Sequence, residues 1–224
     1  MKDSEGYVVI DSSIMTHTRG RMSVEAGIVQ YCGYMEGVKH RISAIETMGS
    51  SPMIELLNGV IQIESIYLQF RKILELIAMA SLITNKDAYS TARASFATDW
   101  HAARILKGIA TVNPSYYPQP VVETSHPDGG KSLEPRAEGL TEEEFGRLYD
   151  RCGDALHTAN PFGTPINYKS FTREVSEWRA KIIALLTMHK VHLLGDTGFW
   201  LIQMAVIGSN KIHYSKWELV DEKR

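Results

Sequence analysis

The chain has 224 residues, of which 44% are hydrophobic, two cysteines and a formal net charge of -2. This length suits one domain, or one domain with an appendage, whose core folds without a disulfide or a metal. The charge balance excludes a surface that is basic throughout, so any role in nucleic-acid binding depends on a local site.

The termini and the cysteines predict a cytoplasmic protein with reduced thiols. The first residues, Met1 to Gly6, are polar, and no apolar run reaches the roughly 18 residues that cross a bilayer, so we expect neither a secretory signal nor contact with a membrane. Cys32 and Cys152 lie far apart and form no metal-binding or redox motif. We therefore expect two partly buried thiols, no metal and no cofactor.

The spacing of apolar residues predicts five helices. Side chains recur every three or four positions over residues 23–48 and 53–83, and a third helix is expected over 88–112. A fourth begins at Thr141, whose spacing to Glu144 is that of a capping box, and ends before Asn160. The fifth covers residues 168–188.

The remaining chain predicts a loop and a small β segment. Residues 114–140 are rich in proline, glycine and charge, which predicts a long loop, most mobile over 121–139. Strands are expected near 190–194, 199–207 and 211–219, as a three-stranded antiparallel meander with one face on the helices. The expected fold is mainly α: a bundle of about five helices over residues 1–188, with the β segment of residues 189–224 packed on it.

The stretch with the most chemical information lies at the end of the fourth predicted helix. On a helix, Arg151, Asp154 and His157 fall within one arc of about 120°. There Asp154 can hold the imidazole in one tautomer, and the guanidinium offers a phosphate a place to dock. A simpler interpretation is a surface pair of Arg151 and Asp154, with His157 at the negative end of the helix dipole.

With this motif the chain resembles the HEPN superfamily, all-helical domains marked by an arginine and a histidine four to six residues apart. Five residues separate Arg151 from His157. The family usually has a tyrosine shortly before the arginine and a polar residue followed by proline after the histidine. Tyr149 and Asn160, in the Asn-Pro step, are similar to these positions. The charged segment 71–75 is similar to the family's earlier core helix. The resemblance covers roughly residues 23 to 188, so the helical part is expected to be HEPN-like.

The resemblance implies a metal-independent endoribonuclease, a defence or stress effector, that acts as a homodimer. Two histidines would share the base and acid roles at a 2′-hydroxyl and a leaving 5′-oxygen, and Arg151 would hold the phosphate. Because Cys152 stands where active relatives commonly have Asn, Asp or His, the orienting role would pass to Asp154. The alternative is a catalytically silent HEPN-like module that binds RNA or another protein.

Three other groups of residues are weaker candidates. Glu36, His40 and His101 could form a metal site between helices, but no Glu-x-x-His pair supports it. His189 and His192 are expected at the surface of a helix-to-strand junction. For the four tryptophans (Trp100, Trp178, Trp200 and Trp217) we expect core packing rather than stacking on bases.

Overall fold

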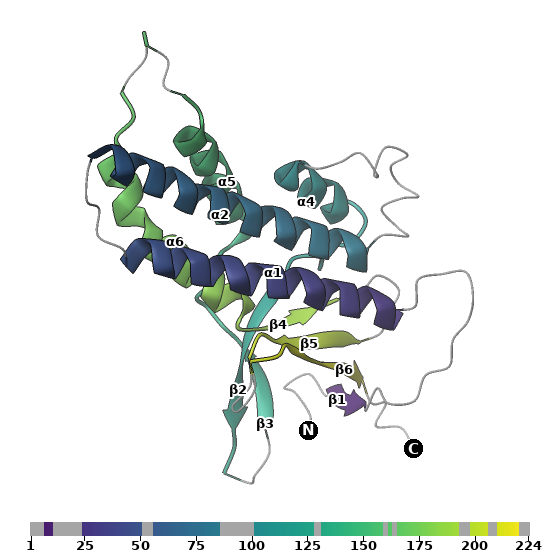
Figure 1. The fold of residues 1–224 in the computed structure, drawn as a ribbon. Helices are drawn as coiled ribbons and strands as arrows, with labels where there is room; N and C mark the ends of the chain where they lie inside the picture. Colours follow the sequence, from purple (N-terminus) through teal and green to yellow (C-terminus); the bar gives the residue numbers. More distant parts are fainter. Residues whose placement is uncertain are drawn as a thin grey trace, which may run out of the picture.

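A computed structural model describes residues 7–10, 24–50, 56–85, 101–127, 131–158, 161–162, 165–192, 198–205 and 210–219. In these ranges five helices lie on one face of a six-stranded antiparallel sheet (Figure 1). The main hydrophobic core contains side chains from the helices and from that face of the sheet. The expected combination of helices with an antiparallel β segment is therefore confirmed, and so is the contact between the two. None of the described helices is long and apolar enough to cross a membrane.

The two longest helices, α1 (Val24–Ser50) and α2 (Leu56–Thr84), lie side by side in opposite directions (Figure 1). Their alignment is fixed near the middle, where Arg41 donates a hydrogen bond of 2.6 Å to the side-chain oxygen of Gln69. The apolar side chains at the centre of α2 are fully buried (Phe70, Ile73, Leu74 and Ile77). Because α2 has apolar side chains around most of its circumference, it forms the middle of the helical layer.

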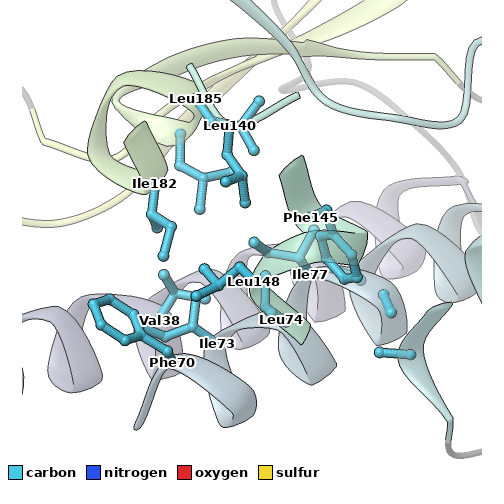
Figure 2. Close-up of a cluster of buried hydrophobic side chains, with 14 of the residues drawn as sticks. Val38, Phe70, Ile73, Leu74, Ile77, Leu140, Phe145, Leu148, Ile182 and Leu185 are labelled. Carbon is cyan, nitrogen blue, oxygen red and sulfur yellow. The ribbon is translucent and has the colours of Figure 1, made fainter. Parts of the chain in front are cut away.

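Three shorter helices complete the layer: α4 (Ala102–Ala110), α5 (Glu142–Leu156) and α6 (Tyr168–Leu186). Figure 2 shows Phe145 and Leu148 of α5 in one cluster with side chains of α2, and Ile182 and Leu185 of α6 entering it together with Leu140. The predicted third helix corresponds to α4 only over residues 102–110, and residues 88–100 of that prediction lie outside the described residues.

The sheet has the strand order β1-β6-β5-β4-β2-β3. Its strands are β1 (Tyr7–Ile10), β2 (Gln119–Ser125), β3 (Lys131–Pro135), β4 (Met188–Val191), β5 (Phe199–Gln203) and β6 (His213–Leu219). The last three pair in chain order, but they form the middle of a six-stranded sheet and not the separate three-stranded meander that was predicted. The predicted boundary at residue 189 therefore falls inside a sheet that takes strands from both sides of it.

The prediction of a long loop over residues 114–140 is wrong where β2 and β3 form a hairpin. Val121 pairs with Pro135 and Ser125 with Lys131, whereas only Gln119 and Pro120 continue into the sheet, against β4. Most of β2 is exposed, so its sequence lacks the alternation of apolar and polar residues that marks a half-buried strand. This exposure explains why a polar, proline-containing segment was predicted as a loop.

The buried position of His189 also contradicts the prediction. On β4 its ring faces the helices, with no exposed surface, and its Nδ1–H donates to the Leu186 carbonyl at 2.9 Å. Its Nε2 accepts a hydrogen bond of 2.8 Å from the Tyr31 hydroxyl. Burial lowers the pKa of His189 to about 4, and the bond to Leu186 opposes this shift, so the ring is neutral at pH 7.

The tryptophans that the structure describes are buried or half-buried, as the prediction of core packing requires. Trp200 and Trp217 are buried and Trp178 is half-buried, whereas Trp100 lies outside the described residues. Trp200 packs in the main core, on the helix side of the sheet. Trp217 lies on the other side, where its ring stacks on Phe199 at 5.7 Å in a second small cluster.

Candidate functional site

The site is built on α5, which is anchored at its start and along its buried face. The Thr141 hydroxyl accepts a hydrogen bond from the Glu144 N–H, and the Glu144 carboxylate accepts one from the Thr141 N–H, both at 3.2 Å. This capping box confirms the predicted helix start. Lys181 of α6 also donates to Glu144 at 2.6 Å. With five side chains in the core, α5 is a fixed support for the residues at its end.

Arg151 is held against α6 by three hydrogen bonds. Its Nε and Nη2 each donate to one oxygen of the Glu174 carboxylate at 2.9 Å, and Nη2 also donates to the Ser170 hydroxyl at 2.6 Å. The guanidinium carbon lies 3.5 Å from the centre of the Phe171 ring. The bidentate carboxylate and the aromatic ring against its face together hold the planar guanidinium in one orientation.

The charges of Arg151 and Glu174 support each other. Burial acts to raise the pKa of the Glu174 carboxyl, but the hydrogen bonds and charge of Arg151 outweigh it, so the pKa lies below its usual value. Burial acts to lower the pKa of Arg151, yet Glu174 outweighs that effect and the pKa is raised. Both groups are therefore charged at neutral pH, and the pair is neutral as a unit.

The structure does not join Asp154 to His157. Both side chains are exposed, and within the described residues neither makes a side-chain hydrogen bond or ion pair. His157 is the C-cap of α5: its N–H still donates to the Gly153 carbonyl at 3.0 Å, and its extended ψ of 139° turns the chain away from the helix only after it. Asp154 contributes through its charge alone, as one of the groups that raise the pKa of Arg151. Glu174, and not Asp154, orients Arg151.

Tyr149 lies on the other flank of α5, against α2 and α4. Its hydroxyl accepts a hydrogen bond of 3.0 Å from Arg71, whose guanidinium carbon is 4.6 Å from the ring centre. The ring of His101 lies 5.0 Å away. With 5% of its surface exposed, Tyr149 packs α5 against its neighbours and does not reach the Arg151 contact on α6. Asn160, the remaining predicted site residue, lies outside the described residues.

Neither Cys152 nor the proposed metal ligands add chemistry to this site. Cys152 is fully buried, and burial raises the pKa of its thiol to about 12, so it stays protonated. His101 packs on Tyr149. Within the described ranges no group of three or more His, Cys, Asp or Glu residues could hold a metal.

Glu174 is the residue that the sequence analysis missed. It stands three positions after Phe171 and four before Trp178, so it borders the inward face of the predicted fifth helix. A carboxylate at the edge of an apolar face was the signal that could have found it, because such a group requires a buried or half-buried partner.

Together these residues present an oriented guanidinium and an exposed imidazole at the end of one helix. Such a pair can bind an anion and transfer a proton. No protein-family model, curated protein or solved structure matches the chain. The chemical character of Arg151 and His157 is therefore the basis for a functional proposal.

Proposed function

We propose that the protein is a HEPN-like, metal-independent endoribonuclease whose cleft forms between two copies of the chain. The observation that supports this proposal is the fixed guanidinium of Arg151, five residues before an exposed imidazole. Its Nη1 has no hydrogen-bond partner within the described residues and can donate to a phosphate oxygen. RNA cleavage without a metal needs a fixed positive charge and an accessible proton-transfer group.

A second copy is needed because one imidazole cannot serve both sides of the scissile bond at once. His157 of one copy removes the proton of the 2′-hydroxyl as this oxygen attacks the adjacent phosphorus. The bond from phosphorus to the 5′-oxygen breaks, and the second copy's His157 gives that oxygen a proton. Arg151 stabilises the charge on the non-bridging oxygens, and Glu174 positions Arg151. The products are a 2′,3′-cyclic phosphate and a 5′-hydroxyl.

Cleavage of RNA in excess chelator tests this proposal. We expect the native protein to cut RNA in EDTA and to leave cyclic phosphate ends, and we expect no cut in the same sequence made of DNA, which lacks the attacking hydroxyl. Sedimentation of the same sample should show a dimer. Loss of cleavage in EDTA, or cleavage of the DNA strand, would contradict the mechanism. A cytoplasmic location and a role as a defence or stress effector belong to the same proposal.

One observation favours a second candidate, a catalytically silent HEPN-like module that binds RNA or another protein. Glu174 neutralises Arg151, and the three hydrogen bonds to Glu174 and Ser170 occupy three of the five N–H donors of the guanidinium. Arg151 would then serve to join α5 to α6. This candidate predicts that the native protein leaves RNA intact in every buffer and binds it, or a protein, equally well after His157→Ala.

A further inference from the structure

A pocket of about 390 Å³ lies where the end of α1 and the beginning of α2 meet α6, at the left in Figure 1. It is separate from the Arg151 site, because its α6 residues (Thr172, Val175, Ser176 and Arg179) differ from those that contact Arg151 (Ser170, Phe171 and Glu174). A pocket of this size takes a small molecule rather than a chain segment.

The inner wall of the pocket is aliphatic and its opening is polar. Ile45, Ile63 and Ile66 are almost completely buried, and half-buried Val175 of α6 continues the same surface. The polar lining residues include Gln62, which donates to the Met48 carbonyl. A ligand that matches this lining has a short branched apolar part at one end and polar groups at the other.

The polar end is defined by an ion pair with spare hydrogen-bonding capacity. Nη2 of Arg179 lies 2.8 Å from one carboxylate oxygen of Glu46. The Nε–H of Arg179 is buried and has no hydrogen-bond partner within the described part of the chain. Buried N–H groups are nearly always paired, and those of a guanidinium pair best with a carboxylate. The rest of the guanidinium is accessible, since 30% of the Arg179 side chain is exposed, and its other N–H groups can donate to a ligand carboxylate.

We propose that this pocket binds a free α-amino acid with a branched aliphatic side chain. The ligand's carboxylate accepts from the exposed part of the Arg179 guanidinium, its ammonium donates to Glu46, and its side chain lies on Ile45, Ile63 and Ile66. A phosphate is disfavoured because Glu46 places a negative charge beside the guanidinium. A ligand that carries both a carboxylate and an ammonium matches both charges of the ion pair at once.

Calorimetric titration of the full chain with three ligands of similar shape tests this proposal. L-leucine carries both charges, 4-methylpentanoic acid lacks the ammonium, and 3-methylbutylamine lacks the carboxylate. We expect leucine to bind at least about 10-fold more tightly than either analogue, because each analogue lacks one of the two charged contacts. Equal affinity for the three ligands, or no heat from leucine, isoleucine or valine at about 10 mM, would overturn the proposal.

Variants test whether leucine binds in this pocket. Arg179→Gln should weaken leucine binding by at least about 10-fold. Arg173→Gln is the matched control, because it removes the same charge from an exposed position of α6 outside the pocket, and it should bind as the native protein does. Ser176→Leu, which adds an isobutyl group to the pocket lining and keeps both charges of the ion pair, should abolish binding even if Arg179→Gln fails to fold. Unchanged binding in folded Arg179→Gln or Ser176→Leu would place the ligand elsewhere and refute the proposal.

Discussion

Glu174 determines how Arg151 is presented, because it accepts two of the three hydrogen bonds that hold the guanidinium. We predict that Glu174→Gln lowers the free energy of unfolding by about 1 kcal/mol, since the pair is bidentate but partly exposed. Urea unfolding measures the change. Glu177→Gln is the control, because its exposed pair with Lys181 should contribute only a few tenths of a kcal/mol. Equal losses in the two variants would contradict the structural role of the Arg151 pair.

His189 should make stability depend on pH between about 4 and 6.5. Its pKa is about 4 in the folded protein and has an ordinary value of 6.5, so in this range the unfolded chain binds a proton that the folded chain does not. The free energy of unfolding therefore falls as the pH decreases, by up to roughly 3 kcal/mol. Unfolding curves at several pH values measure the slope.

A variant isolates this effect. His189→Gln has no titrating ring, so we expect it to be less stable at pH 7 and to show a flatter pH dependence above pH 4.5. Below that pH the carboxyls of Glu144 and Glu174, whose pKa values are lowered by their cationic partners, add a separate loss on protonation. A slope identical to that of the native protein would mean that His189 titrates normally.

Sequence spacing drew attention to Arg151 and His157, but it did not identify Glu174, the residue that holds Arg151. Helical periodicity describes one helix at a time, whereas Glu174 comes from another helix that packs against it. Asp154 was selected because it shares a helix with both residues, but its exposed side chain makes no hydrogen bond or ion pair within the described residues. A residue pattern within one element can therefore propose a site residue, and packing between elements decides its partner.

At the scale of elements, Gly198 before β5 is required by close contact with β6. A Cβ atom there would overlap the carbonyl oxygen of Trp217 and come within 3.0 Å of its carbonyl carbon. We predict that Gly198→Ala lowers the free energy of unfolding by at least about 2 kcal/mol, because the two strands must separate. Gly33→Ala is the control: it meets nothing within 4 Å on α1 and should stabilise by up to about 1 kcal/mol. Equal stabilities in a thermal melt would contradict the close contact.

The start of α5 gives a further prediction. Thr141→Ala removes the side-chain cap of the helix that holds Arg151 and should cost about 1 kcal/mol in thermal or urea unfolding. Thr158→Ala, at an exposed position beyond the other end of α5, should change stability by less than about 0.5 kcal/mol. A cap variant as stable as the native protein would show that core packing alone fixes the helix.

The helices with a strong apolar periodicity were predicted from the sequence, whereas the strands that are short or exposed were not. The capping box of Thr141 and the apolar repeats of α1, α2 and α6 have local causes that can be read from the sequence. In contrast, β1 has four residues, and β2 is paired with β4 only at Gln119 and Pro120. Long-range pairing with β6 forms β1, and the exposure of β2 removes the apolar alternation that would mark its hairpin with β3.

At the scale of the whole molecule, α6 links the two sites. Glu174 holds Arg151 on one side of the helix, and Arg179 lines the aliphatic pocket on another. The same helix packs in the core through Ile182 and Leu185 (Figure 2), so both sites lie on a rigid support. The proposed ribonuclease site and the proposed amino-acid pocket can therefore be tested by variants that do not share residues.

The most direct test of the ribonuclease proposal is RNA cleavage by His157→Ala beside the native protein, with melting measured on both. Because the His157 side chain is exposed, its removal should cost about 1 kcal/mol or less and leave the melting temperature nearly unchanged. The rate of cleavage should fall roughly 10²- to 10⁴-fold, as expected for the loss of a general acid or base. Cleavage that persists in the folded variant, or a collapse of the melting temperature with the loss of activity, would contradict the catalytic role of His157.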